Sequence, residues 1–248
     1  MKDPKDIRIL VACEESQEVC SAFRVLGYEA YSCDLQECSG GHPEWHILGD
    51  AIEAVNMNES CFMTQDGGTH IYKKWDMLIA HPPCTYLSNV ATRHYSLRCC
   101  SPEKVCARWE ERAKAAVFFM QFMLADIPMI AVENPVGFMN SAYRKADQII
   151  HPYYFASNEF DRENYYSKRT CLWLKGLPVL KRTNSLSAPP PMYICHGEKS
   201  NGNKIGWTEG MRNIKGGQFE RAKARSKTFP GIAQAMAKQW GNYLLEVI

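Results

Sequence analysis

Residues 76–84 read Asp-Met-Leu-Ile-Ala-His-Pro-Pro-Cys, an apolar run that stops at two prolines and a cysteine. The apolar run predicts a strand that is buried on both faces, and proline ends a strand because it has no amide to donate to the ladder. A second run of this kind, Pro128–Val132, is followed by Glu133-Asn134-Pro135. Each predicted strand therefore delivers a side chain with useful chemistry at its end, Cys84 after the first and Glu133 after the second.

The segments on either side of these two strands alternate between strand and helix patterns. Ser16–Leu26 carries apolar residues at helical spacing, and Pro102–Leu124 predicts a long helix with Ser101 as its N-cap. Further strands are predicted at Ile7–Ala12 and Glu29–Cys33. This alternation predicts an α/β fold with a mostly parallel sheet, whose functional side chains lie at the carboxyl ends of the strands.

The C-terminal part of the chain has a weaker pattern. A strand is predicted at Thr170–Leu174 and a helix at Phe229–Leu245. Between them, Pro178–Gln218 is rich in proline and glycine and has no clear period, which predicts a small irregular lobe. We divide the chain into a catalytic domain (1–177), a recognition segment (178–224) and a C-terminal helix that returns to the catalytic domain (225–248).

The composition is that of a globular protein, with 46% hydrophobic and 23% charged residues. The 11 cysteines are odd in number and contain no CxxC pair, so we expect neither a disulfide framework nor a zinc or other metal site. Met1–Asp6 is polar and lacks the features of a secretory signal, and the most hydrophobic stretch, Ala115–Val132, is interrupted by Gln121 and Asp126. We therefore expect a soluble, cytoplasmic protein without a membrane partner.

The charge is unevenly distributed along the chain. Residues 1–159 carry 14 basic and 21 acidic residues, whereas residues 160–248 carry 15 and 6. A basic segment on an acidic body indicates a polyanion as partner, although an ordinary solvated basic surface is the alternative. The residues expected to contact nucleic-acid phosphates are Lys181, Arg182, Lys199, Lys204, Arg212, Lys215, Arg221, Lys223 and Arg225.

Three predicted strand ends carry polar residues that a plain scaffold does not require: Asp34, Cys84 and Glu133. Two prolines before Cys84 hold it on a rigid loop, which suits a nucleophile, while a small buried side chain is the alternative. A carboxyl group beside apolar residues has a raised pKa, so we expect Glu133 to hold a proton near neutrality, the alternative being a surface turn. We expect all three side chains to face one crevice.

In chain order, these residues resemble the DNA cytosine-C5 methyltransferase family. Ile9–Gly27 is similar to the strand and helix that hold S-adenosylmethionine, Asp34 to the ribose-binding acid, and Asp50 to the adenine-contacting aspartate. The family's glycine-rich first loop is replaced here by Cys13–Glu18, which contains no glycine. The resemblance implies a Rossmann-like S-adenosylmethionine-dependent methyltransferase sheet with a small irregular recognition lobe. The implied cofactor-binding residues are Cys13, Glu14, Ser16, Gln17, Asp34, Asp50, Pro82 and Ser226.

The catalytic half of the resemblance lies later in the chain. Pro83-Cys84 is similar to the family's catalytic loop, and Glu133-Asn134-Pro135 is similar to its Glu-Asn-Val motif. Lys168-Arg169-Thr170 resembles the basic motif whose arginine supports the catalytic site, and Ser226–Gly241 resembles the helix that completes the cofactor pocket. The implied catalytic residues are Cys84, Glu133 and Arg169.

The resemblance implies an enzyme, a DNA (cytosine-5-)-methyltransferase of the compact type found in phages and mobile elements. Cys84 would add to C6 of a cytosine that is flipped out of duplex DNA, while Glu133 assists at N3. We expect a monomer. Two alternatives stay open: C5 methylation of a pyrimidine in RNA or a free nucleotide, because the recognition segment is short, and a catalytically inactive DNA-binding relative, because the first loop lacks glycine.

Overall fold

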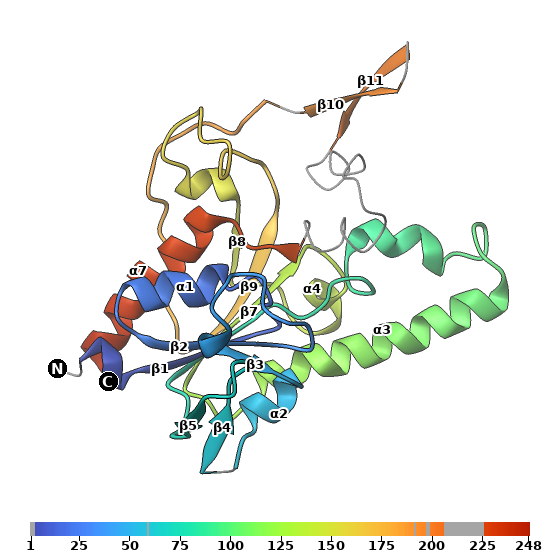
Figure 1. Cartoon of the computed structure of the whole chain (residues 1–248). Coiled ribbons are helices and arrows are strands. Elements are labelled where there is room, and N and C mark those ends of the chain that lie inside the picture. Colours follow the sequence, from blue (N-terminus) through green and yellow to red (C-terminus); the bar gives the residue numbers. More distant parts are fainter. Residues whose placement is uncertain (1–2, 59, 191, 197–198, 206–225) are drawn as a thin grey trace.

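The computed structural model describes residues 3–58, 60–190, 192–196, 199–205 and 226–248. A seven-stranded sheet of order β3-β2-β1-β6-β7-β9-β8 forms its centre (Figure 1). The first five strands in that order run parallel, β9 runs antiparallel to β7, and β8 runs antiparallel to β9. The strands are β1 (Arg8–Ala12), β2 (Glu29–Asp34), β3 (His46–Leu48), β6 (Met77–Ala80), β7 (Met129–Pro135), β8 (Gln148–Ile150) and β9 (Thr170–Lys175). The predicted α/β class with a mostly parallel sheet is thus confirmed.

Helices cover both faces of this sheet. Successive strand residues point to opposite sides, so apolar strands present apolar side chains on both faces. On β1, Ile9 and Val11 belong to one buried cluster, which includes residues of two helices, α1 (Glu18–Val25) and α7 (Pro230–Val247). Leu10 and Ala12 belong to the second cluster, which includes residues of α2 (Ala51–Val55) and α3 (Pro102–Met123). The central strands are apolar on both sides for this reason.

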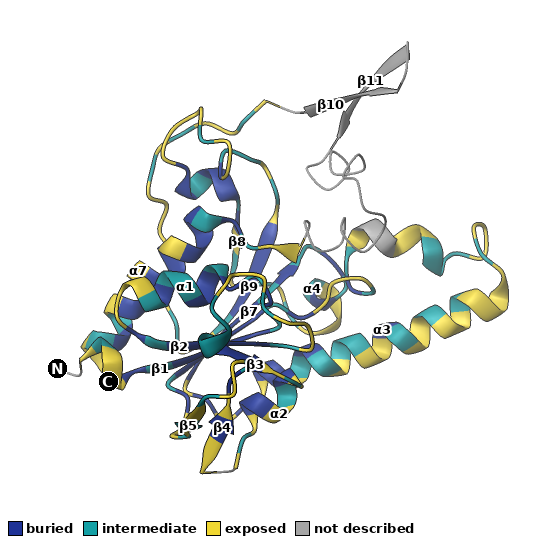
Figure 2. Ribbon diagram, viewed as in Figure 1, coloured by how far each residue is buried: buried dark blue, intermediate teal, exposed yellow. Residues whose placement is uncertain are grey.

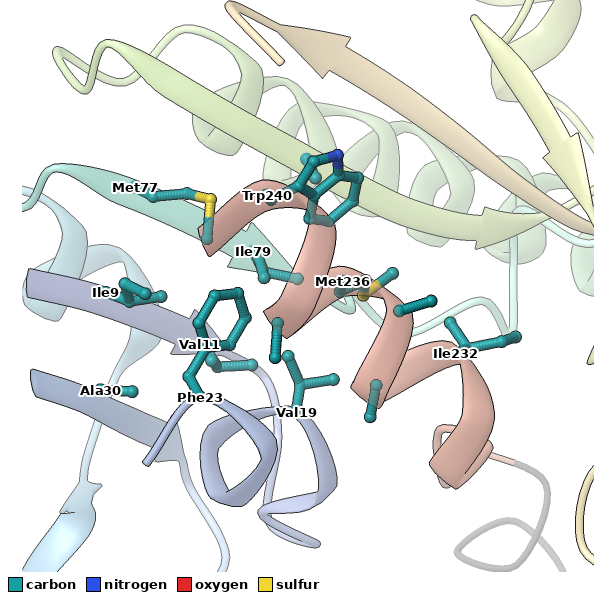
Figure 3. Packing of buried hydrophobic residues seen from close by; sticks show 14 of the residues in the cluster. Ile9, Val11, Val19, Phe23, Ala30, Met77, Ile79, Ile232, Met236 and Trp240 are labelled. Carbon is teal, nitrogen blue, oxygen red and sulfur yellow. The ribbon is translucent and has the colours of Figure 1, made fainter. Parts of the chain in front are cut away.

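The C-terminal helix α7 packs beside α1 on one face of the sheet. Figure 3 shows Ile232, Met236 and Trp240 of this helix lying near Val19 and Phe23 of α1. All five side chains are buried. The end of the chain therefore lies over β1 and β6, next to the segment that follows β1.

The buried residues of the long helix α3 begin only at its middle. Its buried residues are Arg112, Phe119, Phe122 and Met123, and the N-terminal half projects from the body (Figure 2). Ser101 is the N-cap residue, as predicted, but its side chain makes no capping hydrogen bond.

Several elements differ from the sequence expectation. Helix α1 begins at Glu18 rather than Ser16, because Gln17 has a left-handed backbone with φ 58°. Strand β7 continues through Pro135, where antiparallel pairing with β9 extends it past Val132. The expectation of an irregular stretch at 178–218 was wrong in part, since β10 (Met192–His196) and β11 (Lys199–Ile205) form a hairpin there.

Short elements that the sequence did not predict complete the fold. They are α2, β3 and β8, the hairpin of β4 (Cys61–Met63) and β5 (Thr69–Ile71), the helix α4 (Met139–Ala142), and the 3-10 turns Pro4–Asp6, Pro43–Trp45, Asn89–Tyr95 and Pro152–Phe155. Within the described ranges, no helix is both long and apolar enough to cross a bilayer.

Candidate functional site

Cys84 lies just beyond the carboxyl end of β6, in a turn that begins at its own residue. The His81 amide still donates to the Ala12 carbonyl (2.9 Å), which extends the sheet by one residue, and the two prolines then end it. The Cys84 carbonyl accepts hydrogen bonds from the amides of Leu87 (3.1 Å) and Ser88 (2.9 Å). The turn leaves the Cys84 side chain exposed at the edge of the sheet.

Glu133 lies in β7, next to β6, and contacts His81. Ala80 pairs with Val132, so the following residues His81 and Glu133 are neighbours on the two strands. Nδ1 of His81 lies 3.2 Å from Oε2 of Glu133, and the side chains are only 8% and 18% exposed. Since an ionised carboxylate can only accept, Nδ1 carries the proton of this hydrogen bond. The contact places a base and an acid beside the Cys84 turn.

The expected raised pKa of Glu133 was wrong, because its pKa is lowered. Burial alone raises it, but the hydrogen bond from His81 and the positive charges of His81 and Lys168 outweigh that effect. The residues that precede Glu133 along the strand are apolar, and they give no sign of these charges. Both basic groups come from other elements, and neither was predicted as a site residue.

Asn134 ties the Cys84 loop to β7. Its buried side chain donates from Nδ2 to the Pro82 carbonyl over 2.7 Å. Farther along, the Phe138 amide donates to the Leu87 carbonyl (2.7 Å), and a Cβ atom added at Gly137 would lie 2.0 Å from that carbonyl oxygen. The loop is therefore held against the end of β7 at two points, and the second requires a glycine.

Two arginines of α3 hold the other side of the same loop. Nε of Arg112 donates to the Tyr86 carbonyl (2.9 Å), and a guanidinium nitrogen of Arg108 lies 3.4 Å from the Thr85 carbonyl oxygen. The Arg112 guanidinium also lies over the ring of Tyr95, 3.3 Å from its centroid. The sequence alone did not identify this clamp, although Arg108 and Arg112 are spaced to share one helix face.

The glycine-free first loop is closed by its own side chains. The Glu14 carboxylate accepts hydrogen bonds from the amides of Val19 (2.7 Å) and Cys20 (3.1 Å) at the start of α1. Glu14 is 4% exposed, and burial raises its pKa to about 7 against the opposing effects of the His81 charge and these two hydrogen bonds. The amides at this helix start, which bind pyrophosphate in dinucleotide-binding folds, are thus occupied by a side chain.

A neighbouring loop packs closely against the first loop through a glycine, Gly40. Gln17 is fully buried, and its side-chain amide donates to the His42 carbonyl (2.8 Å) and accepts from the His42 amide (3.1 Å). Gly40 lies so close that an added Cβ would be 2.5 Å from Cβ of Gln17. The Ser39 amide donates to the Glu15 carbonyl over 2.8 Å. The first loop and residues 39–42 therefore form one locked unit.

Asp34, at the end of β2, and Asp50, after β3, both act electrostatically on Cys13, which follows β1. Burial raises the pKa of the Cys13 thiol, and the charges of Asp34 and Asp50 raise it further. Asp50 caps α2, accepting from the Ile52 amide at 2.6 Å, and Asp34 accepts from the Gln36 amide at 3.0 Å. This end of the site is acidic. Ser16 is half-buried in the same loop.

The basic motif reaches the site through the antiparallel strand β9. Because β9 runs opposite to β7, its first residues lie at the carboxyl end of β7. Lys168 is the residue whose charge acts on Glu133, whereas Arg169 is exposed and its charge acts on His151 and Cys171. Lys168, rather than Arg169, is thus the basic residue linked to Glu133.

Ser226 precedes a contact with the start of α1. The ammonium of the next residue, Lys227, lies 2.7 Å from Oε1 of Glu18. The segment before α7 therefore returns to the helix that follows the first loop.

The residues expected to contact nucleic acid are only partly described. Lys181 and Arg182 are exposed, and the Arg182 guanidinium lies 4.3 Å from the ring centroid of Tyr154. Lys199 and Lys204 lie in β11, where they pair with His196 and Tyr193. The remaining five, Arg212, Lys215, Arg221, Lys223 and Arg225, lie outside the described residues.

Comparisons with family models and with curated proteins found no match for this sequence. In the part of the chain that the structure describes, no group of three His, Cys, Asp or Glu residues could hold a metal ion.

Proposed function

We propose that this protein transfers a methyl group from S-adenosylmethionine to C5 of cytosine in DNA. The observation that carries the proposal is that the Cys84 loop and Glu133 both follow the last paired residues of the adjacent parallel strands β6 and β7, where Asn134 also bonds to the loop. In open α/β sheets, ligands bind outside these ends. A nucleophile and an acid–base group held there suit covalent catalysis on an electrophilic ring carbon.

The first loop favours the binding of a cationic cofactor over the binding of a dinucleotide. The Glu14 carboxylate occupies amides that a pyrophosphate would need, and Asp34 and Asp50 make the same end acidic. A pyrophosphate would be repelled there, whereas the ammonium and sulfonium of S-adenosylmethionine would be attracted. The residues present therefore fit this cofactor, with Asp34 and Asp50 as the groups expected to hold it. Bound S-adenosylmethionine would supply an electrophilic methyl group on a positively charged sulfur.

The chain's own residues then prepare the cytosine for methylation. The Cys84 thiolate adds to C6, the C5–C6 double-bond electrons shift toward C4, and N3 takes a proton through Glu133. This makes C5 nucleophilic enough to accept the methyl group. Loss of the C5 proton to water, departure of Cys84 as a thiolate and return of the N3 proton to Glu133 restore the aromatic ring. Lys168 and His81 keep Glu133 charged until the base arrives.

DNA is the proposed substrate because of the charge distribution along the chain. The segment 160–248 carries 15 basic and 6 acidic residues, which favours contacts with phosphates. A cytosine inside a duplex is unreachable, so the target base has to be flipped out. The exposed position of Cys84 at the edge of the sheet is compatible with a base that arrives from outside.

The test is incubation of the purified protein with radiolabelled S-adenosylmethionine and duplex DNA, single-stranded DNA or RNA, followed by nucleoside analysis. Label in 5-methylcytosine from duplex DNA is expected, and Cys84→Ala should abolish it while Cys99→Ala, at another exposed cysteine, should not. Label in adenine only, or in no base of any substrate, would refute the proposal. Label found only in RNA would mean that the substrate is RNA and that the methyl-transfer chemistry is as proposed.

A further inference from the structure

The hydrogen bond between His81 and Glu133 can do more than orient the Glu133 carboxylate. The two side chains are 52 positions apart in the sequence and meet at 3.2 Å because β6 and β7 are adjacent and in register. They are 8% and 18% exposed, so the hydrogen bond is largely shielded from solvent. Bulk water therefore has only limited access to the proton that the two side chains share.

Nε2 of His81 makes no described hydrogen bond that a proton transfer from Nδ1 would have to break. Nε2 is buried and has no hydrogen-bond partner among the described residues. An N–H at Nε2 therefore has no described acceptor either before or after the Nδ1 proton leaves. The proton on Nδ1 can pass to Glu133 without breaking any other described hydrogen bond of the imidazole, and the neutral ring keeps its remaining proton on Nε2.

The groups that face this pair come from three other segments. Glu14, in the first loop, is acidic, and His81 lowers its pKa electrostatically. Lys168, before β9, acts on Glu133 from the other side, and Cys171 in β9 has its pKa raised by burial and, in part, by the Glu133 charge. Two basic groups, His81 and Lys168, thus act on Glu133, and both lower its pKa.

We propose that His81 stores the proton that Glu133 delivers to N3 of the cytosine, an inference that rests on the proposed cytosine chemistry. In this scheme His81 carries two protons before the base enters; it passes the Nδ1 proton to the Glu133 carboxylate, and Glu133 passes a proton to N3 as the Cys84 sulfur bonds to C6. His81 is left neutral. When the carbon–sulfur bond breaks, the N3 proton returns through Glu133 to His81, so the pair is restored in each turnover. His81 acts through Glu133 and is a positioning residue in this scheme.

The test is His81→Asn, whose amide can donate the same hydrogen bond to Glu133 but cannot release a proton. We expect methyl transfer to slow by about 100-fold at pH 8, since acid–base assistance contributes about 100-fold or more. The loss should shrink toward pH 6, where solvent protons reach Glu133 directly. His94→Asn, at a histidine whose only described side-chain hydrogen bond is to Arg93, is the matched control and should keep the wild-type rate and pH profile.

Two results would overturn the proposal. A His81→Asn protein with wild-type rates would show that orientation alone is needed, and so would a loss of equal size at every pH from 6 to 8. Cytosine methylation by the wild-type protein separates either result from a failure of the proposed function, because a wild type that methylates no cytosine overturns both.

A double-mutant cycle keeps the inference testable if His81→Asn lowers the melting temperature. His81→Asn and His81→Gln are each combined with Glu133→Gln, and tritium release from DNA labelled at C5 of cytosine measures Cys84 addition. A proton supplied through Glu133 predicts that removing His81 costs nothing further once Glu133 is gone. Additive losses would mean that His81 acts independently of Glu133 and would contradict the relay.

Discussion

Replacing Glu14 by glutamine is expected to change how the stability of the protein depends on pH. The carboxyl has a pKa of about 7 in the folded protein against 4.5 for an ordinary glutamate. Below pH 4.5 the group is neutral in both the folded and the unfolded chain, so it imposes no penalty. As pH rises from 4.5 to 7, the unfolded chain releases the proton first, and the free energy of unfolding falls.

The magnitude follows from the size of this shift. A difference of two to three pKa units corresponds to about 3 kcal/mol of lost stability, fully present above pH 7. Glutamine carries no charge and escapes this loss, but its NH2 group cannot accept from the second helix amide, which costs about 1 kcal/mol. Glu14→Gln should therefore be less stable than the wild type at pH 4.5 and more stable at pH 8.

Urea denaturation at several pH values from 4.5 to 8 measures the difference between the two proteins. The free energy of unfolding of the wild type should fall relative to Glu14→Gln by about 3 kcal/mol across this interval. Glu53→Gln, at an exposed side chain, corrects for the general effect of removing one negative charge. A difference between wild type and Glu14→Gln that stays constant with pH would show that Glu14 is ionised in the folded protein and would refute the reasoning.

Two glycine substitutions test the packing around the site. Gly137→Ala should reduce methyl transfer at least 10-fold and lower the melting temperature, because the new Cβ would lie 2.0 Å from the Leu87 carbonyl oxygen and displace the Cys84 loop; unchanged activity would mean that the loop is not held there. Gly40→Ala should weaken S-adenosylmethionine binding in calorimetry, because its Cβ would lie 2.5 Å from Cβ of Gln17. Gly49→Ala, where nothing lies within 4 Å of an added Cβ, is the control, and equal affinity of the two variants would contradict the locked loop.

The central strands and long helices were predictable because their signals are local. The apolar runs at β1, β6 and β7 are buried on both faces, and such runs are readable without knowing their partners. The apolar spacing of α7 likewise matched its buried stripe, including Trp240. Strands β3 and β8 were missed because three residues carry no period, and their neighbours in the sheet stabilise them.

The chemistry of the candidate site could be predicted only in part. Cys84 and Glu133 were recognisable because each follows an apolar run and a change to polar residues. The sign of the Glu133 pKa shift was wrong, because it depends on His81 and Lys168, which belong to other segments. Glu14 was expected to contact the cofactor, and its hydrogen bonds to the first amides of α1 were not foreseen.

The sequence by itself determined the central strands and the long helices, and that polar side chains follow several of the strands. Both properties depend on neighbours along the chain, through apolar periodicity and the missing amide of proline. Only the tertiary structure decided that His81 meets Glu133 and that β9 brings Lys168 to the same edge. Strand order and register set those contacts, and they bring together residues far apart in the sequence. A charged group responds to whatever lies within a few ångströms, so the protonation of the site is a property of the folded chain.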